Sequence, residues 1–239
     1  MLNILKKMKK FKYLIFLISL LFNKKKFISM TSSQNDNKES EFLDSLIEKL
    51  NKKEFIEFGF HPFEFNTINL MIKNYRGTLV DANYKNVLFM RILNFFHNYK
   101  VKLVHKYLDK KNILELTNKK YDIFSIDIDG NDYWLTKEIL ENNINFELMI
   151  VEYNSSFLDK SISVPYDPYF DRHKKHSSGW YHGASLNAFI KLFGYSGYSL
   201  VKTTGGNNAF FVKRESLKKF NLNELTFNEA FEESKLRNS

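Results

Sequence analysis

Three aspartates surround one glycine in the segment YDIFSIDIDGNDYW, which covers residues 121–134. The apolar run at its start predicts a buried strand that ends at Asp127 and Asp129. A carboxylate there can take the proton of a reacting hydroxyl, or can hold a divalent cation together with other oxygen ligands. It can also pair with backbone amides and simply close the strand, while Gly130 permits the turn. The residues alone leave these three interpretations open.

Other predicted strands of the same sheet also end in polar residues. Strand 54–59 ends at Glu57 and Gly59, strand 78–82 at Asp81, and strand 146–154 at Glu152 and Asn154. Ligands of open α/β sheets bind outside the carboxyl ends of the strands, so we expect these residues to share one binding edge. Asp81 suits a ribose, because a carboxylate can accept from both hydroxyls of the diol. For Asp132 we favour a simpler role, a negative charge at the start of the next helix.

A divalent cation is one alternative for this edge, since Mg²⁺ prefers oxygen ligands and would lower the pKa of a hydroxyl beside it. The candidate metal ligands are Asp127, Asp129, Glu152 and Asn154. In the other catalytic interpretation, Asp127 or Asp129 acts as a general base or orients one. His182 is the preferred candidate among the histidines, because it adjoins an irregular segment that we expect to overhang the strand ends.

The elements that must position these residues alternate in type along the chain. Short apolar runs and helical periods follow one another from Glu54, and YSLVKTT and NAFFVKR flank GGNN, which favours a β-hairpin turn. This pattern predicts a single Rossmann-like α/β domain. Its sheet is expected to be seven-stranded and mostly parallel, with a C-terminal antiparallel hairpin and helices on both faces.

We divide the chain into four predicted parts around this domain. They are a basic apolar segment at 1–30, a polar linker at 31–40, the domain at 41–215 with an irregular insertion or lid at 155–182, and a polar helical tail at 216–239. Long irregular insertions in compact domains are usually functional or mobile. The aromatic residues of this insertion could stack on a sugar, or could anchor a lid.

Composition narrows the classes of function. The 239 residues include no cysteine, which excludes disulfides and a cysteine nucleophile and fits a reducing compartment. The net charge is +9, but eight lysines and no acid lie within residues 1–35, so the remainder is nearly neutral. Without a basic folded part or a nucleic-acid-binding motif, we expect no nucleic-acid partner.

The N-terminal segment MLNILKKMKKFKYLIFLISLLFNKKKF combines basic ends with an apolar stretch from Tyr13 to Phe22. That stretch is shorter than the roughly 20 residues that a membrane-spanning helix needs. Four interpretations of this segment stay open: peripheral membrane contact through residues 1–26, packing on the domain, a true start of the protein at Met30, and secretion. We expect a cytoplasmic protein, with the inner face of a membrane as its peripheral site under the first alternative.

Six blocks of the chain carry a resemblance to a known family. FIEFG, GTLVDAN, YDIFSIDIDGNDYW, MIVEYN, YHGASLNAF and GYSLV…NNAFFV resemble, in order and spacing, the blocks of FkbM-like S-adenosylmethionine-dependent methyltransferases, over residues 53–213. The resemblance implies a class I Rossmann-like sheet whose last strand is antiparallel. It also implies that Glu57 and Gly59 belong to the cofactor loop, that Asp81 meets the ribose, and that Asp127 lies near the methyl group and the acceptor.

The loop after the first strand departs from this family pattern. It reads EFGFHPFEFNT, with one glycine, and places Phe60 and His61 where bulk is expected to obstruct the cofactor. The expected function is methylation of a hydroxyl on a sugar, glycolipid or small metabolite, with Asp127, Asp129 and His182 as catalytic candidates. The alternatives are a degenerate Rossmann-like binding or scaffold module without cofactor, and a nucleotide-sugar-binding transferase.

Overall fold

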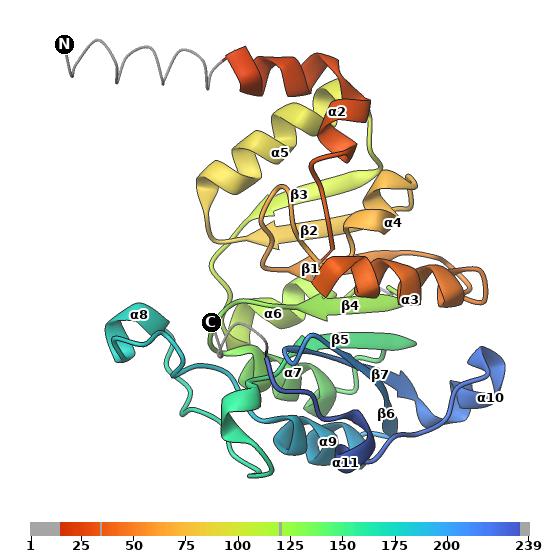
Figure 1. Cartoon of the computed structure of the whole chain (residues 1–239), viewed down its shortest axis with the longest axis vertical. Helices are drawn as coiled ribbons and strands as arrows, with labels where there is room; N and C mark the ends of the chain where they lie inside the picture. Colours follow the sequence, from red (N-terminus) through yellow and green to blue (C-terminus); the bar gives the residue numbers. More distant parts are fainter. Residues whose placement is uncertain (1–14, 34, 120, 235–239) are drawn as a thin grey trace.

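Seven strands form one twisted sheet in the order β3-β2-β1-β4-β5-β7-β6 (Figure 1). The computed structural model describes residues 15–33, 35–119 and 121–234. The strands are β1 Phe55–Phe58, β2 Gly77–Asp81, β3 Val101–His105, β4 Ile123–Ile126, β5 Leu148–Glu152, β6 Tyr198–Thr204 and β7 Asn208–Lys213. β7 runs antiparallel to both of its neighbours, β5 and β6, and the other described pairings between these strands are parallel. The predicted Rossmann-like sheet with a C-terminal hairpin is therefore confirmed.

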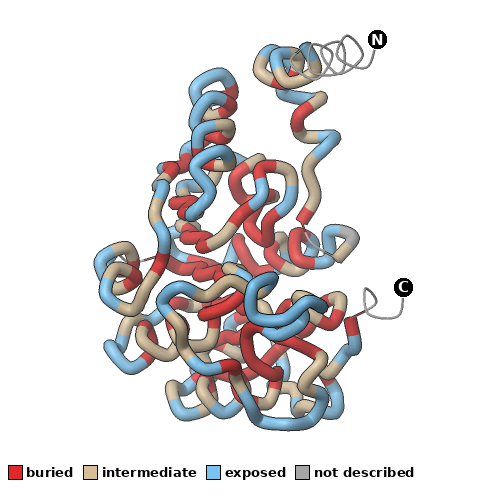
Figure 2. Tube along the Cα trace, turned by 90° about the vertical axis from the view of Figure 1, so that its left-hand side faces the viewer, coloured by how far each residue is buried: buried red, intermediate tan, exposed pale blue. Residues whose placement is uncertain are grey.

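The strands are mainly apolar because helices cover both faces of the sheet. Along β7, Phe210 and Val212 enter one buried layer, whereas Ala209 and Phe211 enter the other. Figure 2 shows this buried centre, surrounded by exposed helices and loops. The sheet thus separates two apolar layers, and its carboxyl edge is left to polar residues.

Each apolar layer is closed by its own set of helices. One is covered by α3 Lys38–Ile47, α4 Ile68–Ile72 and α5 Tyr84–His97. The other is covered by α6 Lys110–Thr117, α7 Asp132–Glu141, α9 Leu186–Tyr195 and α11 Phe227–Ala230. The remaining short helices are α2 Lys24–Ile28, α8 Arg172–Lys175 and α10 Leu217–Phe220, with 3-10 turns η1 Asn35–Asn37, η2 Ser155–Phe157 and η3 Arg214–Ser216.

Two stretches differ from their predicted structure. Residues 31–40 were predicted as a polar linker, but η1 and the start of α3 lie within them and Glu39 is fully buried. The reason is a set of long-range hydrogen bonds to the β6–β7 hairpin, in which Thr204 donates to Glu39 and Asn35 donates to Asn207. The predicted helical tail contains only α10 and α11 within its described part, joined by extended chain.

The part of the N-terminal segment that the structure describes packs on the domain. Residues 15–22 are helical, and Leu20 and Phe27 are completely buried in the layer closed by α5. The His97 ring nitrogen Nε2 lies 2.9 Å from the Leu20 carbonyl oxygen and 3.1 Å from that of Leu21, at the end of this helix. None of the described helices is long and apolar enough to cross a membrane.

Candidate active site

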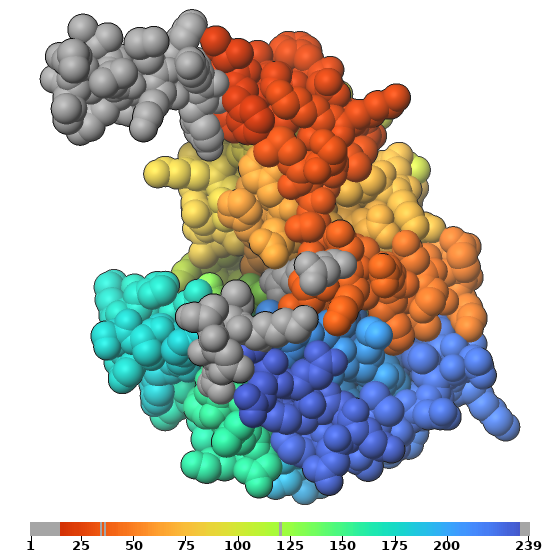
Figure 3. All heavy atoms as spheres, viewed as in Figure 1, coloured from red at the N-terminus to blue at the C-terminus, as the bar shows by residue number. Residues whose placement is uncertain are grey.

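A cavity of about 1130 Å³ lies along the carboxyl ends of β1, β2, β4 and β5. Its wall includes all eight residues that the sequence singled out at this edge: Glu57, Gly59, Asp81, Asp127, Asp129, Glu152, Asn154 and His182. Residues from the insertion, from the segment before α3 and from the hairpin turn complete the wall. In Figure 3, a recess separates the cyan segment that carries α8 from the yellow and orange residues above it.

Gly59 allows the loop after β1 to cross close to the end of β4. Its φ angle is +80°, and a Cβ atom here would lie 1.7 Å from the Asp127 carbonyl oxygen. No other residue type fits this conformation and this space. The bulky residues after it do not fill the cavity: Phe60 is buried against Phe65, and the His61 backbone closes a tight turn with Glu64. Both residues still line the cavity, so their predicted obstruction of a cofactor stays a prediction.

Asp81 lies at the end of β2 and joins that strand to the loop after β1. Its Oδ2 accepts a hydrogen bond from the Phe60 amide at 3.0 Å, and its Oδ1 accepts one from the Asn83 amide at 2.6 Å. Burial raises the pKa of Asp81, while these amides oppose the shift. A carboxylate has about four acceptor sites, so Asp81 can accept further hydrogen bonds from a ligand in the cavity.

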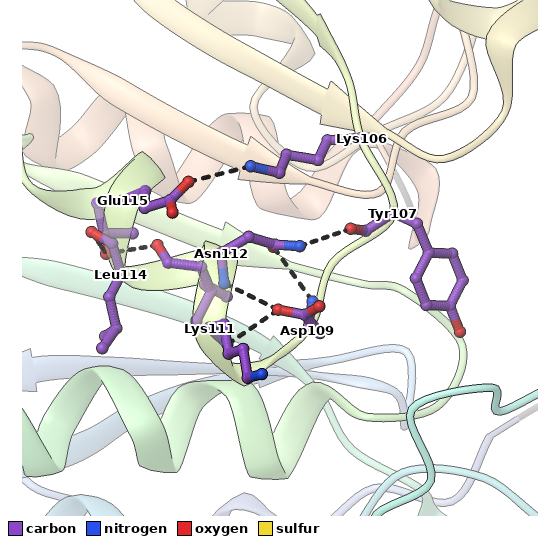
Figure 4. Close-up of polar contacts among 9 residues, drawn as sticks. Lys106, Tyr107, Asp109, Lys111, Asn112, Leu114 and Glu115 are labelled. Atoms are coloured by element: carbon purple, nitrogen blue, oxygen red, sulfur yellow. Dashed lines mark hydrogen bonds and ion pairs between the residues drawn. The ribbon is translucent and has the colours of Figure 1, made fainter.

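The loop between β3 and α6 forms the wall next to Asp81, and its shape is set by a capping box (Figure 4). Asp109 accepts from the Lys111 and Asn112 amides at 2.9 and 2.8 Å, and Asn112 accepts from the Asp109 amide at 3.2 Å. The Asn112 side chain also donates to the Tyr107 carbonyl at 2.9 Å. Figure 4 shows the Tyr107 ring directed away from α6, and Tyr107 lines the cavity. We did not predict α6, whose Asp109–Asn112 capping pair is readable in the sequence.

Glu57 lies in the cavity wall but is almost completely buried, and its carboxyl group forms hydrogen bonds with two other parts of the fold. Its Oε2 accepts from the Thr67 amide, which precedes α4, at 3.1 Å, and its Oε1 accepts from the Ser125 hydroxyl of β4 at 3.1 Å. Burial raises the pKa of Glu57 to about 8, against the opposing effect of these hydrogen bonds. At neutral pH, Glu57 is therefore mainly a neutral acid that fixes the positions of β1, β4 and α4.

Three carboxylates converge at the ends of β4 and β5. One oxygen from each of Asp127, Asp129 and Glu152 lies within 4.8 Å of the others. Arg172 of α8 forms an ion pair with Asp129. Such crowding of like charges is stabilised either by protons or by a cation.

The side chain of Asp132 holds the loop after β4. The Asp132 side chain is buried and accepts from the Ile128 and Gly130 amides at 2.8 and 2.9 Å. Burial raises its pKa to about 6. Asp132 does begin α7, but its side chain binds the preceding loop. Asp129, with a φ angle of +59°, makes the turn that we assigned to Gly130. Gly130 instead makes room for the Phe170 ring, 2.3 Å from where a Cβ atom would lie.

Glu152 and His182 form a buried pair beside this cluster. The His182 Nδ1 atom lies 3.6 Å from Glu152 Oε2, just beyond hydrogen-bond distance. Burial raises the pKa of Glu152 well above its usual value, and the charges of Asp127, Asp132 and Asp129 add to the increase. The surroundings of Glu152 therefore favour its protonated form.

Side chains from the start of α7 and from the region after β5 fasten the 155–182 insertion over the cavity. Asn131 donates to the Asp167 carbonyl at 2.7 Å, and Trp134 donates to the Val164 carbonyl at 2.8 Å. Asn154 donates to the carbonyls of Trp180 and His182 at 2.8 and 2.9 Å, and accepts from the Ser156 amide at 2.9 Å. Asn154 therefore has a positioning role here, and its role as a metal ligand stays a prediction.

The run DRHKKH, from Asp171 to His176, has the composition of a solvated charged segment. His176 fits that description, since it is exposed and bonds to Ser178. Arg172 does not, because it reaches the carboxylate cluster. Nothing in the local sequence distinguishes this arginine from the neighbouring lysines, so only the fold identifies it.

Comparison with known proteins gives no family and no close relative. No protein-family model matches the chain, and no curated protein matches it. An O-methyltransferase from Bacillus cereus in complex with SAH shares 16% identity, with 72% of this chain and 78% of that chain covered, at a TM-score of 0.46. An SAH-bound methyltransferase from Podospora anserina shares 10% identity, with 75% and 79% covered, at a TM-score of 0.48. These likenesses are distant, and the assignment of the fold rests on the strand order itself.

Proposed function

We propose that this protein is an S-adenosylmethionine-dependent methyltransferase that methylates a hydroxyl group. One observation carries the proposal: a single cavity connects Asp81, at the end of β2, with the carboxylates and the histidine at the ends of β4 and β5. A cofactor bound by its ribose at one end would thus extend towards acid–base groups at the other. The sequence blocks of the FkbM-like group support the same activity.

The residues along the cavity fit S-adenosylmethionine. Asp81 would accept hydrogen bonds from the ribose, and the loop containing Tyr107 would lie beside the adenine. The close approach of Gly59 to β4 leaves backbone at the cavity wall where the amino-acid part of the cofactor would pass. When bound, the cofactor supplies an electrophilic methyl group on a positively charged sulfur, and an acidic surrounding suits that charge.

The acceptor hydroxyl must lose a proton, and we assign its removal to Glu152 and His182. The raised pKa of Glu152 makes its carboxylate a stronger base than an ordinary carboxylate. His182, 3.6 Å away, can share that proton when the pair tightens around a substrate. Asp127 lies in the same cluster and would orient the hydroxyl.

A divalent cation is the second candidate for this cluster. The three carboxylates of Asp127, Asp129 and Glu152 offer the oxygen ligands that Mg²⁺ prefers, although the Arg172 ion pair already neutralises part of their charge. A bound Mg²⁺ would displace the shared protons and lower the pKa of the acceptor hydroxyl. In that case Glu152 would act as a ligand instead of a base.

The first experiment is titration of S-adenosylmethionine and S-adenosylhomocysteine into the full chain by calorimetry, with and without Mg²⁺. We expect micromolar binding, which Asp81→Asn weakens at least about tenfold, because one charged hydrogen bond is worth roughly 1.5–3 kcal/mol. Adenosine alone should compete, since the proposed contacts include the ribose. A chelator should change binding or activity only if the cation is used.

Asp159→Asn is the matched control, because Asp159 is exposed and lies outside the cavity wall. Its affinity and melting temperature should equal those of the wild type. Failure of both cofactor forms to bind at millimolar concentration would contradict the proposal. The protein would then be a Rossmann-like module that recognises a partner without this cofactor.

A further inference from the structure

Half of the exposed large apolar side chains in the described residues lie on just two helices. They are Ile15, Ile18 and Phe22 of the N-terminal helix, with Tyr84, Leu88, Ile92, Phe95 and Phe96 of α5. We call these eight residues the apolar face. Phe95 is 83% exposed and Phe22 is 74% exposed, which is unusual for phenylalanine in a protein surrounded only by water.

The two helices present these residues as one continuous surface. On α5, the spacing from Tyr84 through Leu88 and Ile92 to Phe95 follows a single stripe of the helix. The rings of Phe22 and Phe96 meet edge-on at 5.1 Å, which joins the two stripes. Figure 1 shows α5 and the N-terminal helix together at one end of the molecule, beyond β3.

The two segments that carry this surface contain basic residues and no acid. Residues 15–35 and 82–108 contain no aspartate or glutamate. They carry Lys24, Lys25, Lys26, Lys85, Arg91, Lys100, Lys102 and Lys106. Except for Lys106, none of these eight forms an ion pair with another described residue. Five further lysines precede Tyr13 in the sequence.

The N-terminal helix and α2 both pack against the domain. Leu20 and Phe27 are buried, Lys24 lies over the Tyr99 ring at 4.4 Å, and Lys24 also donates to the His97 carbonyl at 3.3 Å. The inner side of these two helices therefore packs on the domain, while Ile15, Ile18 and Phe22 are exposed.

We propose that the apolar face and its basic border bind the surface of an anionic lipid bilayer. The aromatic and aliphatic side chains would enter the boundary between headgroups and acyl chains. The lysines would meet the anionic headgroups while their hydrocarbon stems lie along the apolar region. The combination of apolar surface with unpaired positive charge fits a lipid surface better than a second copy of the same basic face, because two such faces would repel each other.

Vesicle flotation of the full chain tests this proposal. We expect binding to vesicles of phosphatidylcholine mixed with phosphatidylglycerol, weak binding to phosphatidylcholine alone, and release as the salt concentration rises. Phe22→Ser with Phe95→Ser should lower the partition coefficient at least about tenfold, because two large apolar side chains are lost from the interface. Lys25→Glu with Lys102→Glu should lower binding to the anionic vesicles only.

Tyr169→Ser with Tyr195→Ser is the matched control, because these two rings are 87% and 92% exposed away from the apolar face. This control should bind as the wild type does. Three results would overturn the proposal: equal binding to neutral vesicles, unchanged binding of the two-phenylalanine variant, or a dimer in sedimentation velocity that the same variant disperses. The second result would assign membrane binding to residues 1–14 alone, and the third would assign the face to a second copy of the chain.

Discussion

Glu57 shows how one residue at the site can dominate the pH dependence of stability. Its carboxyl group is buried among Thr67, Ser125 and apolar side chains, so folding favours the protonated form. The unfolded chain ionises at an ordinary pKa of about 4.3, whereas the folded protein ionises this group at about 8. The contribution of Glu57 to the free energy of unfolding is therefore fully present below the pKa of the unfolded chain. It is lost as the pH rises through the pKa of the folded protein.

We expect Glu57→Gln to remove most of this pH dependence. The amide keeps the shape of the side chain and can still bond to Thr67 and Ser125. Between pH 5 and pH 8, the free energy of unfolding of the wild type should fall by a few kcal/mol more than that of the variant, on the order of 1.4 kcal/mol per pKa unit. Denaturant titrations at several pH values measure this difference. Glu41→Gln, at an exposed glutamate, should keep the slope of the wild type.

The residues that meet at the site could be predicted because parallel strands deliver their carboxyl ends to one edge. Asp81, Asp127 and Glu152 follow apolar runs that identify strands without further information. The roles of Asn154 and Arg172 could not be predicted, because each depends on where the 155–182 insertion folds back. That path is set by long-range contacts that leave no local pattern.

At the scale of elements, the capping box of α6 connects helix stability to the shape of the cavity wall. Asn112 bonds both to the Asp109 amide and to the Tyr107 carbonyl, although it does not itself line the cavity. Loss of this side chain should leave α6 less stable and the loop with Tyr107 less ordered.

For Asn112→Ala we expect the free energy of unfolding to fall by about 1 kcal/mol. The affinity for S-adenosylhomocysteine should fall as well, because the preformed loop would have to be ordered on binding. Thermal unfolding and calorimetry on the same sample measure the two effects. Asn145→Ala is the control, since Asn145 is exposed and bonds only within its own loop. If Asn112→Ala lowers the free energy of unfolding but leaves the affinity for S-adenosylhomocysteine unchanged, the loop does not contribute to the site.

At the scale of the whole molecule, residues 15–28 are joined to the domain through a small number of buried contacts. Leu20 and Phe27 supply the apolar part, and the His97 ring supplies the polar part at the Leu20 and Leu21 carbonyls. The segment lies at the edge of the apolar layer, so it can open locally while the sheet stays intact.

His97→Leu should therefore release this segment before the domain unfolds. We expect trypsin to cleave at Lys24–Lys26 about five- to tenfold faster, since the lost hydrogen bonds contribute roughly 1–2 kcal/mol to closing the segment. The melting temperature of the domain should change much less. His105→Leu is the control, because His105 is exposed and bonds to Ala82 at the other end of β3. Equal cleavage rates for both variants would contradict the anchoring role.

The position of β7 has a consequence for the nascent chain. β5 is complete at Glu152, but its outer edge pairs only with β7, after the chain has first passed to β6 and turned back. Until Lys213 has left the ribosome, the edge of β5 remains an open template for any extended peptide. The hairpin must dock through its second strand, with Phe210 and Phe211 closing the two layers together. Synthesis that stops before Asn208 would release a chain prone to aggregate, and chaperones are expected to be needed most at that stage.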